Sequence, residues 1–168
     1  YQLKQSGSIP DLPIFLDSPM AISATKLLWQ FHNEHRLPEK LCADVCDVAT
    51  YVNTVDESKS LEKTSMPSVI ISASGMATGG RILHHLKHFV VDPRNTILFT
   101  GFQAGGTRGD RMVKGENEIK IHGQFYPVNA RVENLTSLSA HADYEGILKW
   151  LRGFKNPPKK TFITHGER

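Results

Sequence analysis

The segment Ser139-Ala140-His141-Ala142-Asp143 holds residue types suited to proton transfer or phosphate binding. His141 falls where an extended stretch gives way to a predicted helix, for which Asp143 is a typical N-cap. An imidazole there can stay neutral, titrate near neutral pH or hydrogen-bond to a carboxylate. Ser139 could donate a hydrogen bond to the same ligand. Taken alone, the pattern favours a hydrogen-bonded structural histidine over a catalytic one.

His165 directly follows the apolar run Thr161-Phe162-Ile163-Thr164, which predicts a strand. A histidine at the end of a rigid strand can be aimed at a metal ion. Catalytic zinc normally needs three protein ligands, so His165 as a ligand requires partners that this sequence does not reveal.

Two glycine-rich segments could approach a phosphate. The first contains Ser74-Gly75 and Gly79-Gly80 before Arg81, and the second runs over 101–109. Glycine lets the backbone come close to a ligand, and a helix N-terminus offers N–H groups to an anion. Neither segment matches GxGxxG or the Walker loop. The residues alone leave phosphate contact open and slightly favour loops that only turn tightly.

Histidine and cysteine pairs elsewhere give weaker signals. His84 and His88 have the i,i+4 spacing of a helical metal site, but no glutamate of an HExxH motif stands between them, so 84–88 predicts a polar helix face. Cys42 and Cys46 predict two small side chains packed one helical turn apart. Two cysteines are too few for a disulfide scaffold, which favours a reducing compartment such as the cytoplasm.

Alternating strand and helix patterns must position these residues. Predicted strands cover 12–16, 48–52, 68–72, 96–100 and 161–164. Predicted helices cover 20–34, 56–62, 81–89 and 144–154, and a hairpin joins 118–121 to 125–128. This order indicates βαβ units around a mostly parallel sheet. Both glycine-rich segments follow strands at the carboxyl edge, where open α/β sheets bind ligands.

Length and composition fit one ordinary globular domain. The chain has 168 residues, 39% hydrophobic and 22% charged, and its 20 basic and 17 acidic residues give a net charge of +3. That charge permits a polyanionic partner. No long apolar run predicts a membrane helix and no signal peptide is recognisable. The first residue is not Met and the last ones follow a strand-like run, so we expect a piece of a longer protein.

Several short stretches occur in an order that is more specific than any one of them. They are Ser72-Ala73-Ser74-Gly75-Met76, Gly79-Gly80-Arg81, Asp92-Pro93-Arg94-Asn95, Gly101-Phe102-Gln103-Ala104-Gly105-Gly106-Thr107, Ser139-Ala140-His141-Ala142-Asp143 and His165-Gly166-Glu167. Over nearly its whole length, the chain resembles the β-CASP branch of the metallo-β-lactamase-fold nucleases, chiefly its RNA-processing members.

The resemblance implies a three-layer α/β fold with a mostly parallel sheet flanked by helices. Residues 1–115 would be most of the β-CASP domain, and 116–168 a smaller α+β RNA-specificity segment that returns to the metallo-β-lactamase domain. In such enzymes two zinc ions activate the attacking water. His141 matches a catalytic histidine, His165 a zinc ligand, and Ser139 a phosphate contact. The implied RNA-contacting set also includes Ser74, Gly75, Gly79 and Gly80.

Departures from the family pattern limit these implications. The metal-binding HxHxDH signature is absent, so we expect this piece alone to hold no zinc stably and to leave RNA uncut. Asp17 matches a later family segment and is not assigned the acidic role of the first β-CASP motif. Single-stranded RNA is the expected partner, with no membrane. A non-catalytic scaffold, a phosphate- or nucleotide-binding module, a DNA-cutting relative and a homodimer all remain open.

Overall fold

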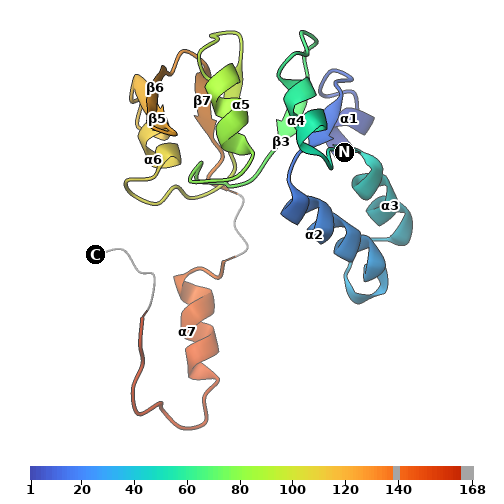
Figure 1. Cartoon of the computed structure of the whole chain (residues 1–168). Coiled ribbons are helices and arrows are strands. Elements are labelled where there is room, and N and C mark those ends of the chain that lie inside the picture. Colours follow the sequence, from blue (N-terminus) through green and yellow to red (C-terminus); the bar gives the residue numbers. More distant parts are fainter. Residues whose placement is uncertain (138–140, 164–168) are drawn as a thin grey trace. The chain divides into compact units, whose positions relative to one another are not determined.

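The structure, a computed structural model, describes residues 1–137 and 141–163 and divides the chain into two compact units, Tyr1–Ser137 and Leu138–Arg168 (Figure 1). The elements in chain order are α1 (Gln2–Gln5), β1 (Ile14–Leu16), α2 (Pro19–Gln30), the 3-10 helix η1 (His32–Glu34), α3 (Glu39–Asp47), β2 (Thr50–Tyr51), α4 (Val55–Leu61), β3 (Val69–Ile71), α5 (Ile82–Phe89), β4 (Thr96–Phe99), α6 (Arg108–Val113), β5 (Glu118–Ile121), β6 (Gln124–Pro127), β7 (Arg131–Asn134) and α7 (Tyr144–Arg152).

Parallel strands flanked by helices form the first unit, which confirms the predicted α/β class. One sheet has the order β2-β1-β3, with Phe15 opposite both Thr50 and Ile70. A second parallel pair joins β4 to β7, with Thr96 opposite Arg131. The expected neighbours β3 and β4 therefore belong to two separate sheets. The sequence pattern could not foresee this, because it identifies strands without their pairing.

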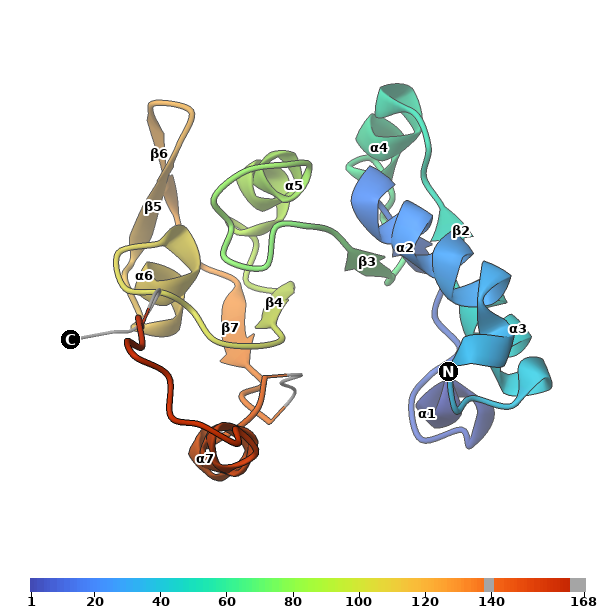
Figure 2. The ribbon, with the colours of Figure 1, turned by 90° about the horizontal axis from the view of Figure 1, so that it is seen from below.

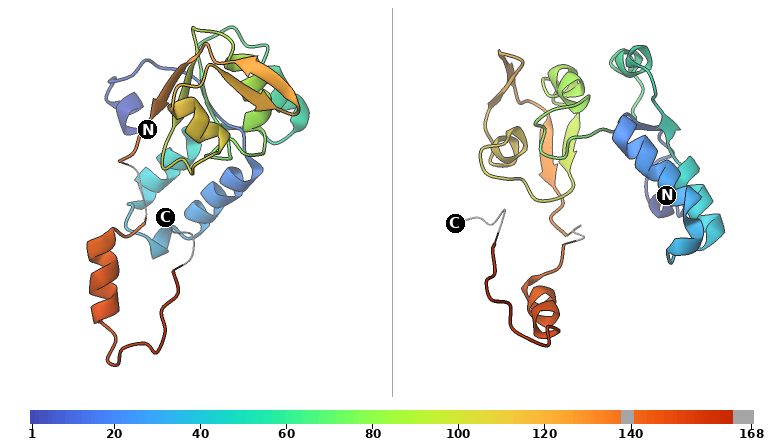
Figure 3. Two further views of the ribbon diagram at one scale, coloured as in Figure 1. Left: turned by 90° about the vertical axis from the view of Figure 1, so that its left-hand side faces the viewer. Right: turned by 60° about the horizontal axis from the view of Figure 1, so that its bottom comes forward.

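The largest group of buried apolar residues lies where α5 packs with β4, α6 and the β5–β6 hairpin. Its members are Ala77, Leu83, Leu86, Val90, Phe99, Met112, Ile119 and Ile121. In β5 every second residue is buried, as expected of a strand with one covered face. The hairpin and α6 lie side by side in two views (Figures 2 and 3). This core fixes α5 and the loop that precedes it.

The turn of the hairpin consists of His122 and Gly123, which have φ angles of 47° and 86°. Two consecutive residues with positive φ match the twist of antiparallel strands, which is why such turns close hairpins. The predicted tight hairpin is thus confirmed, with strand register Ile121 opposite Gln124.

Helix α2 begins as predicted but exposes a different face. The Ser18 hydroxyl accepts a hydrogen bond from the Ala21 N–H, and Pro19 occupies the first turn. The predicted end at residue 34 is wrong, because α2 stops at Gln30 and η1 follows. The spacing of the apolar residues by three and four predicts a buried stripe made of Met20, Ala24, Leu27, Leu28 and Phe31, and this prediction is also wrong. Ile22 is the buried residue of α2, while three stripe residues, Met20, Leu27 and Phe31, are exposed.

Three α-helices were not predicted: α1, α3 and α6. Helix α3 packs beside α2 and buries both Cys42 and Cys46, which confirms their predicted packing role. Both are free thiols, and burial raises the pKa of the Cys46 thiol.

The sequence pattern did not indicate α6, because glycines surround this helix. Its N-cap Thr107 accepts from the Asp110 N–H, and this Thr-x-x-Asp spacing was the available signal.

For α4, expected over 56–62, the sequence predicts Asp56 as the N-cap, and this prediction is also wrong. Thr54, rather than Asp56, caps this helix in a capping box with Glu57: the Thr54 hydroxyl accepts from the Glu57 N–H, and the Glu57 carboxylate accepts from the Thr54 N–H.

The second unit contains α7, capped as predicted by Asp143, whose carboxylate accepts from the Gly146 N–H at 2.7 Å. No residue of α7 is buried. Residues 161–163 are extended without forming a strand, so the predicted strand 161–164 is wrong over them, and Thr164 lies outside the described residues. Among the helices described, none is long and apolar enough to cross a membrane.

Candidate functional site

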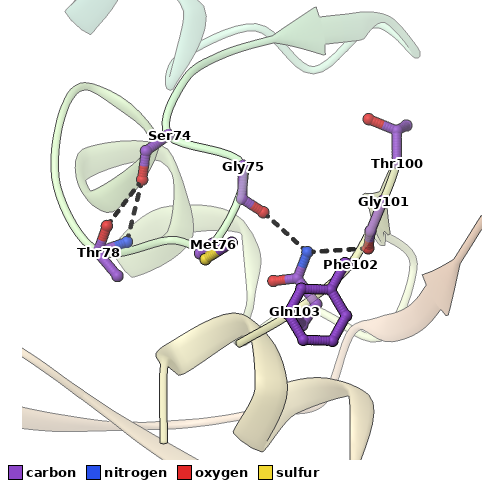
Figure 4. Close-up of a pocket in the computed structure, with 8 residues that line it drawn as sticks. All are labelled: Ser74, Gly75, Met76, Thr78, Thr100, Gly101, Phe102 and Gln103. Carbon is purple, nitrogen blue, oxygen red and sulfur yellow. Dashed lines mark hydrogen bonds between the residues drawn. The ribbon is translucent and has the colours of Figure 1, made fainter. Parts of the chain in front are cut away.

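A hollow of about 300 Å³ opens between the two glycine-rich loops (Figure 4). The loop after β3 contributes Ser74, Gly75, Met76 and Thr78, and the loop after β4 contributes Thr100, Gly101, Phe102 and Gln103. Although β3 and β4 belong to different sheets, the loops at their carboxyl ends meet. The expectation that these loops share one edge therefore holds at the level of the loops themselves.

Gln103 joins the two loops. Its side-chain Nε2 donates to the Gly75 carbonyl at 3.1 Å and to the Gly101 carbonyl at 3.2 Å. A second link runs from the Gly109 N–H to the Met76 carbonyl at 3.1 Å. A Cβ at Gly109 would lie 1.8 Å from Gln103 Oε1, so glycine is needed for this close approach. These contacts fix the walls of the hollow relative to each other.

The first loop keeps several backbone donors available. Within the described residues, the N–H groups of Gly75, Met76, Gly79 and Gly80 have no hydrogen-bond partner. The Ser74 hydroxyl accepts from the Thr78 N–H at 3.1 Å, which holds the loop in a tight turn. Unpaired N–H groups on a concave loop are suited to binding an anion.

The N-terminus of α5, by contrast, is closed to a ligand. The Ile82 N–H donates to the Ala73 carbonyl at 3.3 Å and the Leu83 N–H to the Gly80 carbonyl at 3.2 Å. An anion at this loop would therefore meet loop donors rather than the first N–H groups of the helix.

A buried carboxylate, Asp17, lies at the carboxyl edge of the β2-β1-β3 sheet and is fully inaccessible to solvent. Its Oδ1 accepts from Arg81, and its Oδ2 accepts from Ser58 Oγ at 2.5 Å and from His85 Nε2 at 2.6 Å. Arg81 also donates to the carbonyls of Val52 and Asn53. The network thus ties the sheet to the start of α5, directly after the first glycine loop.

Burial by itself raises the pKa of Asp17, but the hydrogen bonds from Ser58, Arg81 and His85 together outweigh it and lower the pKa below its ordinary value. Because the ionised carboxylate can only accept, His85 Nε2 carries a proton. Among the described residues, His85 Nδ1 is buried without a hydrogen-bond partner. Asp17 is therefore an ionised anchor for Arg81.

Comparison with known proteins decides the family. The Beta-Casp domain profile matches residues 1–112, and the profile of the Zn-dependent metallo-hydrolase RNA specificity domain matches residues 126–168. The chain belongs to the β-CASP family. This confirms the resemblance seen in the sequence.

Curated relatives cover nearly all of this β-CASP chain. Ribonuclease TTHA0252 of Thermus thermophilus is 36% identical over 95% of the chain, which spans 37% of that protein. An RNase J-like protein of Methanocaldococcus jannaschii is 32% identical over 98% of the chain, spanning 38% of the relative. Transcription termination factor FttA of Methanosarcina mazei is 30% identical over 97%, spanning 27%. The chain therefore spans less than half the length of these relatives.

The structure of the β-CASP chain brings together only part of the predicted site. Ser74 and Gly75 line the hollow, whereas Gly79 and Gly80 close the same loop without lining it. His141 is an exposed residue of the second unit, two positions before the N-cap of α7. Two further site residues, Ser139 and His165, lie outside the described residues.

The histidines of α5 require one correction. His85 was expected on a polar face with its neighbours, but it is buried against Asp17. His84 lies near His122, with ring centroids 5.5 Å apart, and His88 packs edge-on against Phe89. Among the described residues, no group of three His, Cys, Asp or Glu side chains could hold a metal ion. Sequence reasoning missed the Asp17 network because its members are 41 to 68 positions apart.

Proposed function

We propose that the longer protein containing this chain is a ribonuclease and that this chain holds the RNA strand beside the reaction centre. The hollow between the two glycine loops is the observation that carries the proposal. It offers unpaired N–H groups at Gly75 and Met76 and lies in a chain matched by both a β-CASP and an RNA-specificity domain. Phosphate oxygens are the acceptors that such backbone donors suit.

An aromatic side chain at the hollow supports a nucleic-acid ligand. Phe102 lines the hollow (Figure 4) and is 64% exposed, so its ring is accessible to a nucleobase. Stacking on an aromatic ring contributes about 1–3 kcal/mol per base and tolerates any sequence. Phosphate donors and a stacking ring in one hollow favour single-stranded RNA over an isolated phosphate.

The catalytic roles belong to the second unit in this proposal. His141 delivers a proton to the leaving oxygen, which contributes roughly 10²–10⁴-fold in rate. Ser139 contacts a phosphate oxygen, and His165 is a metal ligand. The family description supports a metal-dependent enzyme.

The residues described do not themselves fit a zinc site, since they offer no three-donor set. Any zinc of the family's type would depend on ligands outside them, and we assign no step of the reaction to it here.

We also place the protein in the cytoplasm. Cys42 and Cys46 support this proposal, because both are free thiols, which are typical of proteins in a reducing compartment.

Cleavage by the full-length protein tests the proposal. A 5′-labelled single-stranded RNA and a DNA of the same sequence are incubated with the metal-loaded protein and with its His141→Ala variant. We expect RNA cleavage that His141→Ala reduces by at least about 10²-fold while the metal content is unchanged. His32→Ala, which removes a half-buried histidine of η1, is the matched control. Binding of RNA without any cleavage would indicate a scaffold, and faster cleavage of DNA would reassign the substrate.

A further inference from the structure

Three elements bring basic side chains together at the tip of the β5–β6 hairpin. His122 forms the turn, His84 and Lys87 lie on α5, and Arg108 begins α6. We propose that these four residues, the hairpin cluster, form a second phosphate site that holds a phosphodiester of the same RNA strand. The identity of the ligand rests on the proposed function, whereas the cluster itself rests on the geometry below.

The positions of the cluster are fixed by the fold. His84 and Lys87 are three residues apart and so share one face of α5. The His84 and His122 rings are 5.5 Å apart between centroids, which connects that face to the hairpin turn. Arg108 Nε donates to the Lys120 carbonyl at 2.6 Å, two residues before His122. Helix, hairpin and α6 therefore present their donors in one place.

Among the residues that the structure describes, no carboxylate forms an ion pair with a side chain of the hairpin cluster. Four arginines of the segment 69–134 pair with a carboxylate: Arg81, Arg94, Arg111 and Arg131. Arg108 instead donates to the carbonyls of Lys120, Ala77 and Thr78, which fix its guanidinium without neutralising it. Within the described part of the chain, Lys87 also lacks an acidic partner. A fixed, unneutralised cationic group is a preformed site for a phosphate.

The cluster is continuous with the hollow. Thr78 lines the hollow, and its carbonyl accepts from Arg108 Nη1 at 3.4 Å. One extended strand could therefore place a phosphate at the first glycine loop and a neighbouring phosphate at the cluster. This continuity favours a polynucleotide over a mononucleotide or free phosphate as the ligand.

The basic residues around His122 disfavour the protonated form of its ring. Lys87 contributes most to lowering the pKa of His122, with further contributions from partial burial, His84 and Arg108. The groups that act on the ring from α5 and α6 are Lys87, His84 and Arg108, and all three lower its pKa. A bound phosphate would reverse this effect and raise the pKa of His122, which makes RNA binding by the cluster stronger at pH 6 than at pH 8.

RNA binding by the longer protein tests the cluster. The protein carries His141→Ala, so that the probe stays intact, and the probe is a labelled single-stranded oligo-uridine followed by fluorescence anisotropy at several salt concentrations. The test variant is Lys87→Gln with His122→Asn, because Asn tolerates the positive φ at this position. The matched control, Lys59→Gln with His32→Asn, removes the same residue types from positions outside the cluster, of which Lys59 is exposed and His32 half-buried.

We expect the test variant to bind about 3- to 30-fold more weakly at pH 6 and to lose about 0.7 of the salt slope for each phosphate contact removed. The control should match the parent. Equal affinity and slope in test and control variants would overturn the cluster while leaving the cleavage proposal intact. If inorganic phosphate shifts the His122 NMR signal but RNA does not, the site is for free phosphate and the inference is wrong. If the protein that keeps His141 binds RNA through the cluster but does not cleave it, only the proposed ribonuclease is overturned.

Discussion

The Asp17 network and the glycine-loop hollow lie on either side of the same loop, but they differ in whether their polar atoms have hydrogen-bond partners. Around Asp17, both carboxylate oxygens accept hydrogen bonds, Arg81 donates to further carbonyls, and solvent is excluded. In the hollow, the N–H groups of Gly75 and Met76 have no partner in the described structure, and Phe102 is exposed.

The contrast separates a site that holds the fold from a site that can hold a ligand. A buried carboxylate with three donors has nothing left to offer a substrate, so its contribution is to stability and to the position of the loop. Unpaired donors on a tight loop contribute little to stability but are ready for an anion. Substitutions on the two sides should therefore separate stability from RNA affinity.

The largest effect is expected from Asp17→Ala. Removing the carboxylate leaves the guanidinium of Arg81 without its partner in a buried setting, which costs about 3–5 kcal/mol of unfolding free energy. Urea unfolding followed by circular dichroism measures it. Asp92→Ala breaks a carboxylate–arginine pair in which Arg94 is 87% exposed and should cost far less. Similar losses in both variants would refute the anchoring role of Asp17.

A smaller loss of stability is expected at the end of the same loop. Gly80 has a φ of 81°, and a Cβ there would lie 2.7 Å from the Ala73 carbonyl oxygen. Gly80→Ala should cost about 1–3 kcal/mol or more, because both the backbone conformation and the contact are unfavourable. Gly79→Ala is the control, since its Cβ would meet nothing within 4 Å. The two variants are compared by their midpoints in urea, and an equal midpoint would contradict the strained position at Gly80.

Acid should weaken the Asp17 network in a defined direction. The pKa of Asp17 is lowered on folding from an ordinary value of 3.8, so the folded protein binds this proton less readily than the unfolded chain. The stabilisation is complete above pH 3.8 and is lost as pH falls through the lowered value. Unfolding free energies between pH 6 and pH 3 should thus fall more steeply for the wild type than for Asp17→Asn. Parallel curves would mean that Asp17 does not titrate differently in the two states.

Local patterns predicted much of the fold because their causes are local. The caps at Ser18 and Asp143, the amphipathic helix α5 and the hairpin turn at His122 each depend on residues within a few positions. The prediction missed α6 because the many glycines around it outweighed the signal of its Thr107 cap. The buried face of α2 was predicted wrongly because packing against α3, and not apolar spacing alone, decides which side is covered.

The candidate site was predictable only in part for the same reason. Glycine and serine composition identified the loops, and strand order placed them at one edge. The link from Gln103 to Gly75 and the three donors on Asp17 join residues 28 to 68 positions apart, which no local pattern contains. An aspartate directly after an apolar strand was the available signal for Asp17, since a charge so close to a core needs a partner.

The smallest effect, and the one that sharpens the contrast most, is expected from Ser74→Ala. Ser74 lines the hollow, so in the proposed function its loss removes about one hydrogen bond to RNA, worth roughly 0.5–1.5 kcal/mol or about a 2- to 10-fold weaker affinity. Anisotropy with labelled single-stranded RNA measures the affinity. Ser60→Ala, which removes a hydroxyl that donates to the Glu57 carbonyl in α4, is the control.

Stability decides how the Ser74 result is interpreted. The Ser74 hydroxyl also accepts from the Thr78 N–H, so its loss could loosen the loop rather than remove a ligand contact. If Ser74→Ala weakens RNA binding while its urea midpoint stays within error of the wild type, the hydroxyl acts on the RNA. If the midpoint falls and affinity is restored by Ser74→Thr, the hydroxyl shapes the loop. A normal affinity together with a normal midpoint would remove Ser74 from the site. The backbone donors of Gly75 and Met76 would then bind the phosphate, because the Ser74→Ala substitution leaves these N–H groups in place.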